Sequence, residues 1–157
     1  MNKWASLFIL GGLCVFLGIG CKSTHPLTID QLANVSIPDP SGIGQSQSLS
    51  IETRPGYYAV GDINNDRAGD LVTTISYSMG GTGFFTDIVV FLNVDGQPLY
   101  ASRENIGDRI MVNSLSLENG IITAAIITQG PGEPMCCGTT PKTLRYKFDG
   151  THLVEMP

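Results

Sequence analysis

The sequence predicts an all-β fold, a small single domain built as a sandwich or barrel of about eight antiparallel strands in hairpins. First, short runs rich in β-branched and aromatic residues follow one another from residue 56 onward. Second, the pairs Asp95-Gly96, Asn119-Gly120 and Asp149-Gly150 separate such runs, and these pairs favour two-residue hairpin turns. Third, no segment has the apolar period of a helix long enough to build a layer.

These turns divide the C-terminal part of the chain into three predicted hairpins. Leu144, Tyr146 and Phe148 alternate with polar residues, which indicates a strand with one face in the core and the other in water. The runs 88–92 and 121–127 are apolar at nearly every position, so we expect two central strands covered on both faces. The predicted pairings are 84–94 with 97–103, 109–118 with 121–128, and 142–148 with 151–155.

Residues 1–20 have the organisation of an export signal, with Lys3, an apolar stretch and small residues before Cys21. The apolar stretch is short for a membrane span of ~20 residues. The sequence Gly18-Ile19-Gly20-Cys21 resembles the lipobox of bacterial lipoproteins, although Gly18 stands where that motif prefers leucine. The resemblance implies cleavage before Cys21 and lipidation of its sulfur; an ordinary cleaved signal and an uncleaved anchor are the alternatives.

Lipidation of Cys21 would attach the protein to a membrane of the bacterial cell envelope. Each buried methylene of an acyl chain contributes about 0.8 kcal/mol, so the two or three chains of a mature lipoprotein hold it there. Lys22 follows the cysteine, and in a diderm host this favours the outer membrane, with the domain facing the periplasm.

The chain after the leader is divided into a tether and a folded domain. Residues 21–55 contain several prolines and a polar Gln-Ser run, so we expect a lipidated tether and a loosely structured segment, followed by the β domain at 56–157. Residues 27–35 are compatible with a short helix, because Thr28 and Gln31 have the spacing of a capping box.

The charge of the chain excludes some classes of partner. Removal of the leader removes Lys3 and no acidic residue, so the formal net charge changes from -5 to -6. Nucleic acid and anionic lipid both require clustered Lys and Arg, and no such cluster is present. The expected partners are therefore the membrane, through the lipid anchor, and another envelope protein or polymer.

A possible metal loop begins at Asp62. Side-chain oxygens of Asp62, Asn64, Asp66 and Asp70, with the backbone carbonyl of Ala68, match the spacing that Ca²⁺ requires. The loop resembles the calcium loops of FG-GAP repeat proteins, which join two strands of a hairpin.

Two residues depart from the known calcium loops. Thr73 stands where an EF-hand has glutamate, and Arg67 stands where the repeats usually have glycine because the turn needs positive φ. The alternative is a bare turn in which Asp62 and Asp70 accept backbone N–H bonds without an ion.

A second possible site is the pair Cys136-Cys137. Cys14 leaves with the leader and Cys21 is used by lipid, so the two have only each other as disulfide partners within the monomer. A bond between adjacent cysteines is strained and easily reduced. The interpretations are a rigid turn, a thiol-redox switch, or a Cu(I) site with Met135.

Few residues of the chain are suited to catalysis. After the leader only His25 and His152 remain, which supplies neither a Ser-His-Asp triad nor a multi-histidine zinc centre. Acidic pairs such as Glu104 and Asp108 would need to converge in a cleft to hydrolyse a substrate. We therefore expect a non-enzymatic protein.

The order of motifs from residue 56 to 155 resembles an uncharacterised domain of bacterial exported proteins and lipoproteins. The resemblance is carried by the glycine- and aspartate-rich loop at 61–70, the glycines at 80–83, and the run Gly130 to Cys137. It implies export and a β fold and supplies no mechanism. Members commonly have proline after the cysteine pair, where this chain has Gly138. Two hypotheses follow: a calcium-braced envelope lipoprotein with a binding or structural role, and a thiol-redox or copper-handling periplasmic protein.

Overall fold

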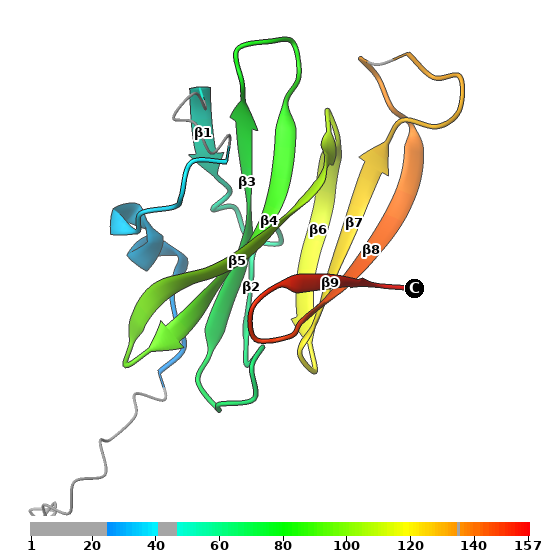
Figure 1. Ribbon diagram of the computed structural model, residues 1–157. Coiled ribbons are helices and arrows are strands. Elements are labelled where there is room, and N and C mark those ends of the chain that lie inside the picture. The colour runs from blue at the N-terminus through cyan, green and yellow to red at the C-terminus, as the bar shows by residue number, and fades with distance from the viewer. Residues whose placement is uncertain (1–24, 41–46, 135) are drawn as a thin grey trace, which may run out of the picture.

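Nine strands in two antiparallel sheets make up most of this computed structural model, which describes residues 25–40, 47–134 and 136–157 (Figure 1). The predicted all-β fold is confirmed as a sandwich. Sheet A contains β1 (Gln47–Ile51), β2 (Ala59–Gly61), β3 (Asp70–Ser78), β4 (Phe85–Val94) and β5 (Gln97–Asp108). Sheet B contains β6 (Met111–Glu118), β7 (Ile121–Thr128), β8 (Thr140–Phe148) and β9 (Leu153–Met156).

Both sheets follow the order of the chain. Sheet A has the order β1-β3-β4-β5, and β2 also pairs with β3. β1 pairs with the C-terminal half of β3 and β2 with its N-terminal end, as the pairs Ile51 with Ile75 and Gly61 with Asp70 show. Sheet B has the order β6-β7-β8-β9.

Two of the three predicted hairpin turns have the expected geometry. Asp95 and Gly96 between β4 and β5 both have positive φ, 53° and 85°, as do Asn119 and Gly120 between β6 and β7, 53° and 73°. The turn between β8 and β9 is longer than predicted and spans 149–152. Its geometry is set by the Asp149 carboxylate, which accepts the backbone N–H groups of residues 151 and 152 at 2.8 Å each and so forms a wider Asx-type turn.

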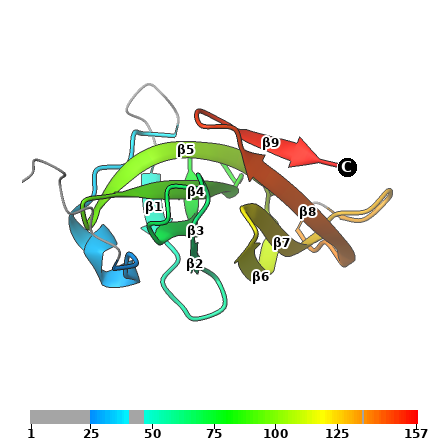
Figure 2. The ribbon, with the colours of Figure 1, turned by 90° about the horizontal axis from the view of Figure 1, so that it is seen from below.

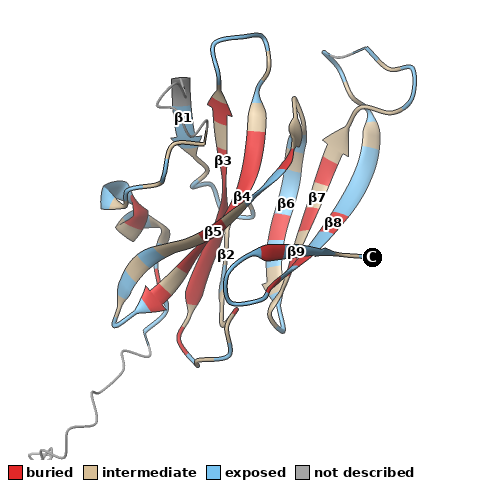
Figure 3. Ribbon diagram, viewed as in Figure 1, coloured by how far each residue is buried: buried red, intermediate tan, exposed pale blue. Residues whose placement is uncertain are grey.

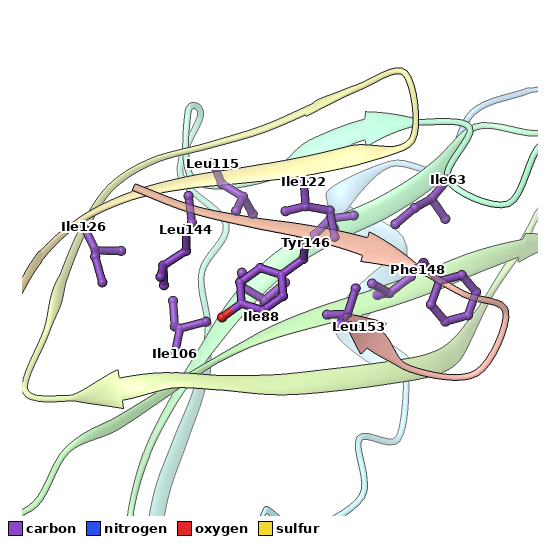
Figure 4. Packing of buried hydrophobic residues seen from close by; sticks show 13 residues of the cluster. Ile63, Ile88, Ile106, Leu115, Ile122, Ile126, Leu144, Tyr146, Phe148 and Leu153 are labelled. Atoms are coloured by element: carbon purple, nitrogen blue, oxygen red, sulfur yellow. The ribbon is translucent and has the colours of Figure 1, made fainter. Parts of the chain in front are cut away.

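The main core lies between the two sheets (Figure 4). Ile88 of β4 and Ile122 of β7 are fully buried, and Leu144, Tyr146 and Phe148 of β8 point inward as their alternation predicted. Fully burying an aliphatic or aromatic side chain contributes about 1.5–3 kcal/mol, so this layer dominates the stability of the fold.

A second core lies on the opposite face of sheet A and is covered by the N-terminal segment. Leu27 and Leu32 are each 2% exposed and pack with buried residues of β3 and β4, including Ile75 and Phe91. Leu32 belongs to a 3-10 helix, η1 (Ile29–Asn34), which lies beside sheet A and away from β6 to β9 (Figures 1 and 2). The folded unit therefore includes residues that precede position 56.

The predicted capping pair opens this helix. The backbone N–H of Thr28 donates to Oε1 of Gln31 at 2.8 Å, and the Gln31 amide nitrogen donates to the Gly96 carbonyl at 2.8 Å. Gln31 thus joins the start of the helix to the turn between β4 and β5. Leu27, which precedes the helix, and Leu32 within it both pack in the second core.

The two predicted central strands differ in how they are covered (Figure 3). β4 is covered on both faces, since Ile88 and Val90 belong to the main core and Val89 and Phe91 to the second. β7 is central in sheet B but has only one buried face; its other face, which includes Thr123 and Ala125 among its members, is partly exposed. The expectation of two-sided cover was wrong for β7 because the N-terminal segment packs on sheet A instead.

Candidate functional site

The loop from Asp62 to Gly69 joins β2 to β3, as the sequence predicts. Gly61 pairs with Asp70 at its base, and Ala59 pairs with Val72 two residues further along the hairpin. The loop therefore projects from one end of sheet A, where the backbone of β3 begins.

Side-chain oxygens inside the loop accept backbone N–H groups. The carboxylate of Asp62 accepts the amides of Asp66 and Arg67, at 3.1 and 2.8 Å. The side chain of Asn64 accepts the same Asp66 amide at 3.1 Å, and that of Asp66 accepts the Ala68 amide at 2.8 Å. Asn64 and Asp66 thus form two successive Asx turns, and Asp62 closes the loop across four and five residues.

The backbone of the loop takes the left-handed conformation at two positions. Asn65 has φ 62° and Arg67 has φ 69°, so the positive φ expected at position 67 is present. Asn tolerates this region, whereas for an ordinary side chain it costs about 1–2 kcal/mol. The hydrogen bonds to Asp62 and Asn64 hold this strained backbone.

Asp70 occupies a different environment from the other acidic residues of the loop. It is fully buried, and its two carboxylate oxygens accept the backbone N–H groups of Ile63 at 2.9 Å and Asn93 at 2.8 Å. Burial raises the pKa of Asp70, and the nearby charges of Asp66 and Asp62 raise it further. Asp70 thus joins the loop to the end of β4.

The structure brings the predicted calcium ligands into one loop, and most of them accept backbone N–H groups through their side-chain oxygens. Asp62 and Asn64 both accept the Asp66 amide and Asp66 accepts the Ala68 amide. Both oxygens of Asp70 accept backbone N–H groups in the interior. Ala68 is 2% exposed. Within residues 25–40, 47–134 and 136–157, no group of three or more His, Cys, Asp or Glu side chains is arranged to hold a metal. The bare turn accounts for all of these contacts, and calcium stays a prediction.

A hollow of about 690 Å³ lies beside this loop. It opens between the loop and the turns that follow β6 and β8. Ile63 and Phe148 form part of its apolar wall, while Asn119 and Lys147 supply polar groups.

The cysteine pair lies in the loop between β7 and β8, and both Cys136 and Cys137 are exposed there. The two sulfurs are in disulfide contact with a Cα–Cα distance of 3.8 Å, and the Cys137 amide donates to the Pro134 carbonyl at 3.2 Å. Met135 lies outside the described residues. The sulfurs therefore sit on the surface, where solvent and other molecules reach them.

Glu133 closes the base of this loop. Its carboxylate accepts the Thr139 hydroxyl and the backbone N–H groups of Gly130 and Thr139, the latter two at 2.8 and 2.9 Å. These bonds, led by the Thr139 hydroxyl, lower the pKa of Glu133 to about 2. The Glu133 carboxylate therefore holds the two ends of the loop together.

A buried polar cluster on sheet A was not found from the sequence. Asp87 of β4 is 2% exposed; it accepts the Tyr77 hydroxyl at 3.1 Å and the Asn105 amide at 2.8 Å, and Arg103 lies 3.8 Å away. Arg103 also donates to the Pro38 carbonyl at 2.9 Å. The sequence contained one signal of this cluster, the charged residue Asp87 directly before the apolar residues of β4. The cluster fastens the N-terminal segment to the sheet.

Cys21 and the export signal lie outside the described residues. The part of the chain that the structure describes contains no helix with the length and hydropathy needed to cross a membrane.

The fold and these loops define a class of protein, a two-sheet antiparallel sandwich with structured connecting loops. Comparisons of the chain with protein-family models, with curated proteins and with solved structures gave no significant match.

Proposed function

We propose that the protein is a non-enzymatic lipoprotein of the bacterial cell envelope, anchored through Cys21, whose β-sandwich has a binding or structural role toward another envelope protein or polymer. The non-enzymatic part of this proposal is supported by the contacts of the carboxyl groups whose pKa values are shifted. In the described residues, Glu52, Asp70, Glu133 and Asp149 have shifted pKa values. An acid or base catalyst needs a shifted group that is free to exchange a proton with a substrate.

Each of these four carboxylates instead fixes the backbone around it. Glu52 accepts the Arg54 amide at 2.9 Å, and Asp149 accepts the N–H groups of the turn that it opens. Asp70 and Glu133 hold the two loops described above. Carboxylates that bind backbone N–H groups stabilise loops and turns. This role favours a binding or structural protein over an acid-base catalyst.

The anchor is tested by metabolic labelling with a radioactive or clickable fatty acid. Wild-type protein is expected to carry the label, and Cys21→Ser is expected to lose it and to keep the leader. Cys14→Ser, inside the leader, is the matched control and should label normally. Label that persists in Cys21→Ser would contradict the lipoprotein proposal.

A partner is best sought by co-purification from gently solubilised membranes. Wild-type protein and a variant carrying substitutions on the exposed loop at 129–139 should be compared under the same conditions. A partner retained by the first and lost by the second would support recognition through that loop, whereas hydrolysis or transfer activity in the purified protein would contradict the non-enzymatic proposal.

The exposed disulfide favours a second candidate function, in thiol redox or copper handling. Cys136 and Cys137 are both exposed to solvent. Tight retention of Cu(I) by the reduced protein, lost in a variant with both cysteines changed to serine, would support this candidate.

A further inference from the structure

We propose that the end of the sandwich that carries Gly69 and the β4–β5 turn faces the lipid surface, and that the end carrying the loops 79–84 and 129–139 faces away from it. This inference rests on the proposed lipid anchor at Cys21. It concerns the orientation of the domain, which the anchor alone does not determine.

The chain is fixed to the sandwich almost as soon as the described residues begin. The His25 carbonyl accepts the side-chain amide of Asn93 at 2.8 Å, and the Leu27 amide donates to the Gly69 carbonyl at 2.9 Å. Leu27 itself is 2% exposed. The backbone and the first apolar side chain are therefore both held at this end of sheet A.

Close packing makes this attachment specific. A Cβ atom at Gly69 would lie 2.5 Å from Cβ and 2.8 Å from Cα of Pro26. Only glycine allows the N-terminal segment to approach this closely. The Asn93 amide donates to the Gly69 carbonyl as well, at 3.2 Å, so strand β4 and the loop hold the segment together.

The covalent length of the tether then limits the position of the domain. Cys21 precedes His25 by four residues. A fully extended chain spans at most about 3.3–3.6 Å per residue, so the two α-carbons are no more than about 14 Å apart. β3 alone, from Asp70 to Ser78, extends over roughly 25–30 Å. The tether is about half as long as the sandwich is tall.

The loops are sorted between the two ends of the sandwich (Figure 1). The loop before β3 and the turns after β4 and β6 lie at the end where the N-terminal segment attaches. The loop between β3 and β4 and the disulfide loop between β7 and β8 lie at the opposite end. With so short a tether, the first end stays beside the membrane and the disulfide is presented to the aqueous side.

The test places one fluorescent probe at each end of the acylated full-length protein. In a background of Cys136→Ser and Cys137→Ser, Val94→Cys labels the tether end and Thr82→Cys the opposite end; both positions are exposed. The acylated proteins are reconstituted into phosphatidylcholine vesicles that contain a headgroup quencher. We expect several-fold stronger quenching of the probe at position 94 than of the probe at position 82.

A lengthened tether is the matched control. Insertion of about 30 Gly and Ser residues after Thr24 gives a flexible chain with a mean span of roughly 30 Å, so quenching at position 94 should fall to the level at position 82. Equal quenching at both positions in acylated protein with the natural tether would overturn the orientation and leave the anchor intact. A protein mass without acyl chains would overturn the anchor itself.

Discussion

Glu133 is a single carboxylate whose ionisation holds a loop closed. Its pKa is lowered from 4.5 to about 2 by the Thr139 hydroxyl and two backbone N–H groups, so the ionised form is favoured in the folded state. The stabilisation is present above the unfolded pKa of 4.5 and is lost as the pH falls toward 2. At neutral pH, Glu133→Gln should therefore melt at a lower temperature than the wild type.

The pH dependence distinguishes this role from a simple packing role. The difference in melting temperature between wild type and Glu133→Gln should shrink as the pH is lowered from 4.5 to about 2. Melting curves followed by circular dichroism over this range measure it. A difference that stays constant across the range would show that the charge of Glu133 is not what closes the loop.

Gly138 is required at its position by the backbone of the neighbouring strand. A Cβ atom there would lie 2.5 Å from the carbonyl carbon and oxygen of Thr128 and 2.7 Å from the Gln129 nitrogen. Gly138→Ala should lower the free energy of unfolding by about 1–3 kcal/mol, because backbone must move to admit the methyl group. Urea unfolding measures the change.

Gly81→Ala is the control for this substitution. A Cβ atom at Gly81 has its nearest neighbour 4.0 Å away, the Gly83 nitrogen, so the change should stay within about 0.5 kcal/mol. Equal effects at Gly138 and Gly81 would contradict the packing explanation.

For single residues, the sequence predicted the backbone conformation well, but it did not predict which acidic side chains are buried. The positive φ at Arg67 was expected from the resemblance to calcium loops that have glycine at this place, and it is present. The burial of Asp70 and Asp87 was not expected, because it depends on strands and segments far away in the sequence that supply their hydrogen-bond donors. A pattern of oxygens along one loop does not show which of them the rest of the fold will use.

At the scale of a single loop, calcium binding predicts a concentration-dependent rise in stability. Extracellular calcium modules bind at roughly 0.1 to 1 mM. About tenfold excess over the dissociation constant would stabilise the fold by ~1.4 kcal/mol, which raises the melting temperature of a domain of about 100 residues by on the order of 6 to 11 °C. Thermal melts with calcium and with chelator measure the shift.

Three substitutions make this test specific to the loop. Asp62→Ala and Asp66→Ala should each abolish the calcium shift, although they also lower the basal stability because their carboxylates accept backbone N–H groups. Asn65→Gly should preserve the shift, since Asn65 is outside the ligand pattern and glycine accepts its φ of 62°. Identical wild-type melts with calcium and chelator would leave the bare turn as the sole interpretation.

The N-terminal segment should behave as part of the core. Leu32 is 2% exposed in the second core, so Leu32→Ala should lower the free energy of unfolding by about 2–5 kcal/mol. Ala33→Ser, on the exposed side of η1, should change it by no more than about 0.5 kcal/mol. If chemical denaturation finds the two variants equally stable, the segment does not contribute to the cooperative fold.

Elements with strong local signals were predicted correctly. The Asp-Gly and Asn-Gly turns after β4 and β6 fix both central residues at positive φ, so the hairpins and their pairing followed from the sequence. The turn after β8 contains the same Asp-Gly pair but is wider, because side-chain bonds to Asp149 compete with the two-residue form. Local sequence thus predicted that the turn exists and not its length.

For the whole molecule, the disulfide should matter little to stability. It joins adjacent residues, so it closes almost no loop and barely restricts the unfolded chain. Protein isolated without reductant should show no free thiol at Cys136 or Cys137, and mild reductant should open the bond without a change in the far-ultraviolet circular dichroism spectrum.

A paired measurement checks this expectation. Thiol titration before and after reduction counts the cysteines, and a variant with both Cys136→Ser and Cys137→Ser should unfold within about 0.5 kcal/mol of the wild type. Two alkylated cysteines in untreated protein, or a large loss of stability on reduction, would contradict it.

The sequence predicted the fold class of the whole molecule, but it did not predict that the N-terminal segment packs on sheet A. Turn residues and apolar runs predicted an antiparallel sandwich or barrel, and two sheets are present. The segment 21–55 was expected to be loosely structured because of its prolines, yet Leu27, Leu32 and β1 within it pack or pair with sheet A. Isolated apolar residues in a polar segment give little periodic signal, so their burial emerges only once a complementary sheet face exists.

The order of the strands has a consequence for how the chain folds. Every ladder joins strands that are adjacent in the sequence, apart from β1 with β3, where only β2 intervenes. Such local pairing lowers the contact order and favours rapid folding for a β protein. As the chain emerges N-terminus first, sheet A can be completed at residue 108 before any strand of sheet B exists. Until sheet B arrives, the inner face of sheet A is uncovered, and in that interval the nascent protein is most exposed to aggregation.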